Sequence, residues 1–156
     1  MPFAGQIIRA LDFPPTAWAE QQANEDNFGH ADWQTGANVC GMSFMAPTSG
    51  RGTIFFHCRF GSIGSPATNA NVSIHIRAGS TVGAGTTIPG GIPSEDDSLE
   101  NPAPGVNTTT NRLGAATLRH LTGLTAGNTY NAVMVHQVVS GTATIFHRTM
   151  LWVPSP

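Results

Sequence analysis

The sequence is poor in charge. Of its 156 residues only 10% are Asp, Glu, Lys or Arg, against about 25% in an average soluble domain. Lysine is missing altogether, so all seven basic residues are arginines, and the net charge is −2. The chain therefore lacks the positive surface by which proteins bind nucleic acids, which argues against such a partner. It also has few charges to keep a large surface in water, so we expect other subunits to cover part of it.

Long apolar runs and secretion signals are also missing. No apolar run approaches the roughly twenty residues that a membrane-spanning helix needs. The opening MPFAGQIIRALDF has no charged segment followed by an apolar core, so no signal peptide and no membrane partner are predicted. Cysteine is scarce as well, with Cys40 and Cys58 alone. We interpret them as reduced, buried core residues, with a disulfide between neighbouring strands as the alternative.

Motifs of catalysis are equally absent. There is no G-x-S-x-G nucleophile turn, and the pair Gly83 and Gly85 is not followed by the Gly-Lys of a phosphate loop. The acidic cluster at residues 95–100 lacks the alternation and the glycine of a calcium loop, so we interpret it as a solvated loop tip. The sequence predicts no enzyme and no cofactor.

Alternation of apolar and polar residues is what the sequence does contain from residue 37 onward. Period two is typical of half-buried strands. The clearest example is 53–60, where Ile54, Phe56, Cys58 and Phe60 fall on one face and Phe55, His57 and Arg59 on the other. Further strands are expected at 38–46, 71–77, 113–121, 130–139 and 142–153, with a possible one at 81–88.

Turn residues separate these strands. The segment LTGLTAGNTY at 121–130 offers glycines for the turn and a tyrosine whose hydroxyl can bond back to the loop. The segment 89–110 is rich in Gly, Pro, Asn and Thr, so we expect a long loop there. Together these patterns predict an all-β fold, an antiparallel β-sandwich or jelly roll of about seven or eight strands over residues 37–156.

Residues 1–36 differ from the rest and are predicted to form an extended N-terminal arm. A strand-like piece ends at Pro14, a weak helical turn is expected over 16–23, and 24–36 is polar. Such a segment cannot build a core, so its apolar side chains need a surface, either this chain's own sandwich or a neighbouring subunit. We predict a docking or subunit-exchange arm with these anchors: Phe3, Ile7, Ile8, Phe13 and Trp18.

Two strands repeat the pair His-x-Arg on their outward faces. The pairs are His57 with Arg59 and His75 with Arg77. If the two strands are neighbours, the four side chains form one polar patch, which we interpret as a possible subunit interface. A metal site is disfavoured because a fixed arginine charge lies beside each histidine. A pH-sensitive interface is a further option, since histidine titrates near pH 6.5.

Three segments resemble small structural virion proteins of tailed bacteriophages of actinobacteria. They are PFAGQIIRALDFPP at 2–15, FMAPTSGRGTIFFHCRF at 44–60, and LTGLTAGNTYNAVMVHQVVSGTATIFHRTMLWVPSP at 121–156. The resemblance implies a non-enzymatic capsid decoration (cement) protein or head fibre, made in the host cytoplasm and placed on the capsid surface. It implies the major capsid protein as partner and a homotrimeric sandwich similar to C1q or tumour-necrosis-factor jelly rolls.

A role in the phage tail is the alternative. A minor tail protein, or a receptor- or glycan-binding protein of the tail, would contact a host-surface glycan. Trp33, Trp152 and the loop 89–110 are the candidates for that contact, because exposed aromatic rings can form a platform for a sugar.

Overall fold

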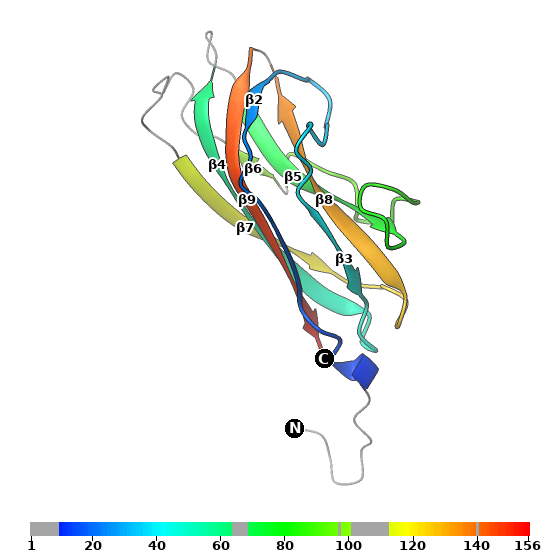
Figure 1. Cartoon of the computed structure of the whole chain (residues 1–156). Coiled ribbons are helices and arrows are strands. Elements are labelled where there is room, and N and C mark those ends of the chain that lie inside the picture. The colour runs from blue at the N-terminus through cyan, green and yellow to red at the C-terminus, as the bar shows by residue number, and fades with distance from the viewer. Residues whose placement is uncertain (1–9, 64–68, 97, 101–112, 140) are drawn as a thin grey trace, which may run out of the picture.

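A computed structural model describes residues 10–63, 69–96, 98–100, 113–139 and 141–156 (Figure 1). Over these residues the chain forms a three-residue 3-10 helix, η1 (Ala10–Asp12), and nine β-strands. The strands are β1 (Ala17–Gln21), β2 (Glu25–Phe28), β3 (Gly41–Met45), β4 (Arg51–Ile63), β5 (Ala70–Ala78), β6 (Leu99–Glu100), β7 (Leu113–Leu121), β8 (Thr129–Val138) and β9 (Ala143–Ser155). No helix in the described part of the chain is long and apolar enough to cross a membrane.

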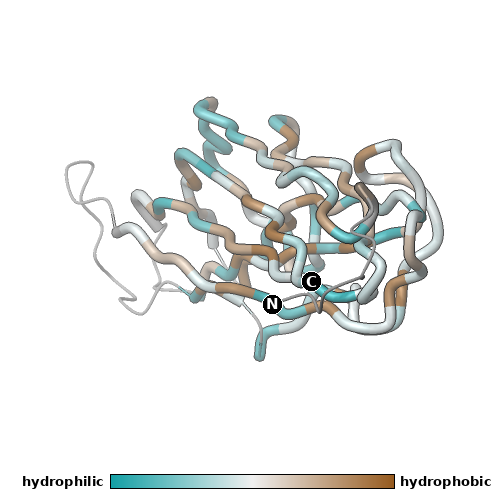
Figure 2. The backbone as a smooth tube through the Cα atoms, turned by 90° about the horizontal axis from the view of Figure 1, so that it is seen from below, coloured by the Kyte–Doolittle hydropathy of each residue, from teal (hydrophilic) through white to brown (hydrophobic). Residues whose placement is uncertain are grey.

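The strands form two antiparallel sheets that pack face to face (Figure 1). Sheet A has the order β1-β9-β4-β7, and β2 also pairs with β9. Sheet B has the order β3-β8-β5-β6. Apolar and hydrophilic residues alternate along the strands (Figure 2). The predicted all-β antiparallel sandwich is confirmed.

The core follows the predicted alternation. In β4, Ile54, Phe56, Cys58 and Phe60 are all at most 2% exposed, whereas Phe55 is 43% exposed on the opposite face. The hydroxyl of Tyr130 accepts a hydrogen bond of 2.9 Å from the backbone N–H of Thr125, as the turn sequence predicts. Local turn chemistry and period two are therefore enough to place these strands and their faces.

Two local predictions are wrong. The helical turn expected over 16–23 is a strand, β1, whose residues pair with 148–152 of β9. The possible strand at 81–88 is a loop, because Gly83 and Gly85 have φ of 79° and 101° and make turns. Its one ladder contact among the described residues is an isolated bridge between Arg77 and Thr87.

This loop, residues 79–92, folds over the outer face of sheet B. Asn131, fully buried in β8, donates from Nδ2 to the carbonyls of Gly79 and Ala84 and accepts from the N–H of Gly83, each at 3.0 Å. The loop explains why Val133 is buried although it lies outside the core between the sheets. The outer face of sheet B is thus partly covered by the chain's own loop.

The second half of the predicted arm belongs to sheet A. Strands β1 and β2 pair with β9, so residues 17–28 pack on this chain's own sandwich. Residues 1–9 lie outside the described part. Of the predicted long loop 89–110, the described part includes β6, which pairs with β5, and residues 101–110 lie outside it.

Candidate functional site

An apolar stripe crosses the outer face of sheet A. The register places Trp18 of β1 opposite Leu151 of β9, Leu151 opposite Phe55 of β4, and Phe55 opposite Leu118 of β7. The four side chains are 68%, 41%, 43% and 42% exposed, respectively. Four strands therefore contribute one side chain each to a row that runs across the whole sheet, and we call this row the apolar stripe.

The stripe is large for a surface that faces only water. A buried aromatic side chain contributes about 150–250 Å², so Trp18 and Phe55 at their observed exposure present on the order of 200 Å². Contiguous apolar patches of a few hundred Å² on soluble proteins commonly mark interaction sites. A shallow groove of about 280 Å³ runs beside the stripe. Its lining consists of Trp18, Phe55, Phe56, His57, Ala116, Thr117, Thr149, Met150 and Leu151.

Polar side chains lie one row along from the stripe. His57 of β4 pairs with Thr149 of β9, and Arg59 pairs with Phe146. Two residues of β9 lie between these partners but only one residue of β4, so β9 has a β-bulge here. One of the two is His147, which has φ of 33°. Its Nε2 lies 2.8 Å from Oε1 of Glu20, and its ring centre lies 6.0 Å from that of His57. We call Glu20, His57, Arg59 and His147 the histidine cluster.

The pKa values of two members of the histidine cluster, His57 and Glu20, are shifted by their surroundings. Burial lowers the pKa of His57, and His147 and Arg59 lower it further. The hydrogen bond from His147 lowers the pKa of the Glu20 carboxyl. His57 is therefore neutral and Glu20 ionised at neutral pH, so the cluster holds a balance of charge that acid would disturb.

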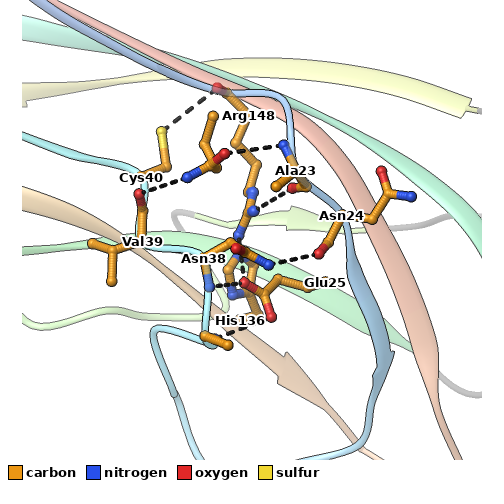
Figure 3. A network of polar contacts seen from close by, with 10 residues as sticks. Ala23, Asn24, Glu25, Asn38, Val39, Cys40, His136 and Arg148 are labelled. Carbon is orange, nitrogen blue, oxygen red and sulfur yellow. Dashed lines mark hydrogen bonds and ion pairs between the residues drawn. The ribbon is translucent and has the colours of Figure 1, made fainter.

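A buried polar network fastens the N-terminal strands to β9 (Figure 3). Arg148, fully buried, donates from Nη2 to the carbonyl of Ala23 at 2.8 Å and lies 3.4 Å from Oε1 of Glu25. The Glu25 carboxylate also accepts from the N–H groups of Ala37, at 3.1 Å, and Asn38. The network joins residues 23–38 to β9, beyond the end of β1, whose own pairing with β9 places Trp18.

A second cavity, of about 350 Å³, lies over this network between residues 25 and 37. Glu25 lines this cavity, but the residue is only 6% exposed, and its carboxylate already binds backbone N–H groups and Arg148. The carboxylate of Glu25 therefore serves to hold residues 23–38 together. Over the described residues no group of three or more His, Cys, Asp or Glu could hold a metal ion.

The predicted arm anchors fall into two groups. Phe13 is 59% exposed and Trp18 is part of the apolar stripe. The other three, Phe3, Ile7 and Ile8, lie outside the described residues.

The predicted single patch of two His-x-Arg pairs does not form. His57 and Arg59 are in sheet A, whereas His75 and Arg77 are in sheet B, so the pairs lie on different faces of the sandwich. The second pair holds the loop 79–92. His75 shares a hydrogen bond of 2.8 Å with Thr87, and Arg77 donates to the carbonyl of Gly83 at 2.7 Å.

Other predictions meet mixed outcomes. The prediction that Trp152 forms part of a sugar platform is wrong. Trp152 is fully buried on the inner face of β9, and its ring centre lies 4.3 Å from that of Phe44. Trp33 is half-buried. Cys40 and Cys58 are free and buried, so the interpretation of two reduced core thiols is confirmed.

Four residues of this face were not singled out from the sequence: Glu20, Leu118, His147 and Leu151. Leu118 and Leu151 lie on the outward face of strands that were predicted, so their exposure could be read from the alternation. Their alignment with Trp18 and Phe55 depends on strand order and register. The contact of His147 with Glu20 depends on the bulge in β9, and no local sequence pattern predicts that bulge.

Comparison with known proteins gives no match to a family model or to a curated sequence. Solved structures with some likeness include a family 35 carbohydrate-binding module from an environmental isolate, with 16% identity, a TM-score of 0.41, and 92% of this chain and 98% of that chain covered. A structure of Bacillus endospore appendages has 8% identity and a TM-score of 0.40, with 97% of this chain and 100% of that chain covered. A structure of infectious bursal disease virus has 9% identity and a TM-score of 0.47, with 90% of this chain and 32% of that chain covered. Likeness this weak carries no functional argument, and the resemblance to actinobacterial phage proteins stays a prediction.

Proposed function

We propose that the protein is a non-enzymatic structural protein whose copies associate through the outer face of sheet A. The observation that carries this proposal is the apolar stripe. Aromatic residues supply much of the binding energy of protein interfaces, and Trp18 is 68% exposed at one end of the stripe. Interfaces between identical subunits are also more apolar than the remaining surface.

A second copy of the chain is the occupant that the composition favours. Only 10% of the residues are charged, so an isolated copy has little charge to hold its surface in water. The stripe is present on every copy, and association buries it in each. For the number of copies in the assembly we propose three, because the resemblance to phage virion proteins implies a homotrimer.

The resemblance also supports a place on the exterior of a bacteriophage capsid. In this proposal the N-terminal segment docks on the major capsid protein with Phe3, Ile7, Ile8 and Phe13, while Trp18 serves the contact between copies. Phe13 is 59% exposed immediately before β1, so it is free to contact a partner. A protein that binds only the assembled shell stabilises it by mass action, as a cement protein does.

The contact between copies is tested by the molar mass of the purified chain in light scattering after gel filtration. We expect a trimer, and we expect Leu151→Arg to reduce it to a monomer with an unchanged near-UV circular dichroism spectrum. Ile92→Arg is the matched control, because Ile92 is 68% exposed outside the stripe. A monomeric wild-type chain, or a folded Leu151→Arg variant of full mass, would contradict the proposal.

The capsid role is tested by electron microscopy of the protein mixed with phage particles that lack it. We expect regular knobs at the symmetry positions of the head. A variant without residues 1–13 should keep its oligomeric state and lose the knobs. Knobs that persist with the shortened chain would refute the docking role of this segment, and density at the tail alone would move the protein to the adsorption apparatus.

Glycan binding is the second candidate, and Trp18 is the observation that favours it. The apolar face of a pyranose can stack on an exposed indole, and the polar residues His57, Thr117 and Thr149 line the groove, where they can bond the hydroxyls of the sugar. A glycan array probed with the wild-type chain and with Trp18→Ala tests this role. Binding that Trp18→Ala removes would support it, and no binding of any host-surface glycan would dismiss it.

A further inference from the structure

The histidine cluster borders the surface that we propose to be covered. The register gives two adjacent rows on the outer face of sheet A. One row is the apolar stripe, and the other consists of Glu20, Thr149, His57 and Ala116. His57 and Thr149 line the groove beside the stripe. A copy that seats on the stripe therefore also covers His57.

We propose that the histidine cluster makes the association of copies depend on pH, so that acid separates them. This inference rests on the proposed function, because it needs the contact between copies to form on this face. The device consists of two imidazoles, one arginine and one carboxylate. His57 and Glu20 lie in the row beside the apolar stripe, and His147 and Arg59 lie beyond that row.

The charges around His57 make its protonation unfavourable. Among the described residues around it, Arg59 lies two positions along β4 and Thr149 lies opposite on β9. His147, in the bulge of β9, has its ring centre 6.0 Å away and is bonded to Glu20 of β1. The facing residues of β7, Gly114 and Ala116, carry no charge. Protonation of His57 places a second positive charge beside Arg59, and an interface excludes the water that would screen the two charges.

The backbone supports a specific role for His147. A φ of 33° is in the left-handed region, which a residue with a side chain seldom adopts. Strained positions of this kind gather at functional sites, and β-bulges re-aim side chains there. Here the bulge directs His147 at Glu20 and brings its ring to within 6.0 Å of His57 between ring centres.

The sign of the effect follows from proton linkage. Burial, His147 and Arg59 already lower the pKa of His57 in the single chain. A covering copy removes more water from His57 and lowers this pKa further, so the assembled state binds fewer protons than the free chain. Association therefore weakens as the pH falls through the range where the free His57 takes up its proton, below about 6.5.

The test is the molar mass of the full chain by light scattering at pH 8, 7, 6 and 5.5, with a near-UV circular dichroism spectrum at each pH. We expect the oligomer at pH 8 and separation toward pH 5.5, with a dissociation constant that rises by up to tenfold per pH unit for one proton at each contact. His57→Gln should stay assembled throughout, because an amide does not titrate. His57→Asn is a second variant of the same kind.

His75→Gln is the matched control, since His75 precedes an arginine by two residues as His57 does, but in sheet B. It should separate as the wild-type chain does. A wild-type chain that is folded and assembled at every pH would overturn this inference alone. The same is true if His57→Gln separates over the same pH range as the wild type. A wild-type chain that is monomeric at pH 8 would instead overturn the proposed function, and this inference with it.

Discussion

Two thiols lie in the core, Cys40 at 1% exposure and Cys58 at 0%. Burial raises the pKa of Cys40 to about 11 and raises that of Cys58 even further. Both groups stay protonated at neutral pH, and the protonated thiol is a poor nucleophile. We therefore expect no reaction of the folded chain with Ellman's reagent at pH 8, and release of two equivalents once urea unfolds it. Rapid labelling of either thiol in the folded chain would contradict their burial.

His136 links a single residue to the stability of the whole fold. It is fully buried in β8, and burial, together with Arg148, lowers its pKa to about 3. In the unfolded chain the pKa of a histidine is about 6.5. Between these values only the unfolded chain holds the proton, so the stabilisation is complete above about pH 6.5 and is lost as the pH falls toward 3.

We therefore expect the free energy of unfolding to fall by up to about 1.4 kcal/mol per pH unit below pH 6.5 through this residue. Urea unfolding at pH 7, 6, 5 and 4 measures it. His136→Gln has no proton to take up, so its stability should vary less over the same range. An equal slope in the variant would show that other groups cause the acid sensitivity.

At the scale of strands, short-range patterns place most of the sandwich. The strand expected at 113–121 is β7, Leu113–Leu121, and the one expected at 130–139 is β8, Thr129–Val138. Both succeed because side chains on a strand alternate between two faces and because glycine-containing turns bound these segments. The buried face of β4 follows from the same rule.

Short-range sequence patterns do not predict which distant segments pair with each other. The five residues of β1 form a strand because β9 offers them a partner, and nothing in AWAEQ alone separates that outcome from a helical turn. The apolar stripe joins residues 18, 55, 118 and 151, which only the strand order brings side by side. The two His-x-Arg pairs look alike in the sequence and lie in different sheets for the same reason.

The network around Arg148 gives a prediction for β1 and β2. Arg148→Met leaves the Glu25 carboxylate buried without its cation, and breaking a buried pair in this way costs about 3–5 kcal/mol. Urea unfolding should show this loss, and amides of residues 17–28 should exchange hydrogen faster. The double variant Glu25→Gln, Arg148→Met should recover part of the stability, because no buried charge remains. Equal stability of the single and double variants would refute the coupling.

The loop over sheet B gives a second prediction at this scale. Asn131→Ala removes hydrogen bonds to Gly79, Gly83 and Ala84, so we expect a loss of about 2 kcal/mol. Faster hydrogen exchange should be confined to residues 79–92 and the strands they cover. Unchanged exchange in the loop would mean that other contacts, such as that of Arg77 with Gly83, hold it in place.

The whole molecule has faces of different character. The outer face of sheet B is partly covered by the chain's own loop, whereas the outer face of sheet A presents the apolar stripe. Helix η1 and the last strand, β9, end close together at one pole (Figure 1). In the proposed assembly this division separates two contacts, because copies meet on sheet A while the exposed Phe13, which follows η1, contacts the capsid.

The boundary predicted at residue 36 is open to a direct test at this scale. A variant without residues 1–13 keeps β1, β2 and the Glu25–Arg148 pair, so its urea midpoint should match that of the full chain. A variant without residues 1–36 loses both strands, exposes the edge of β9 on which they pair, and removes the Ala23 and Glu25 partners of Arg148, so its urea midpoint should fall. If the shorter variant is as stable as the full chain, residues 17–28 contribute nothing to the sandwich and the arm is a separate unit. If it unfolds as expected, only the residues before β1 are free to act as a docking arm.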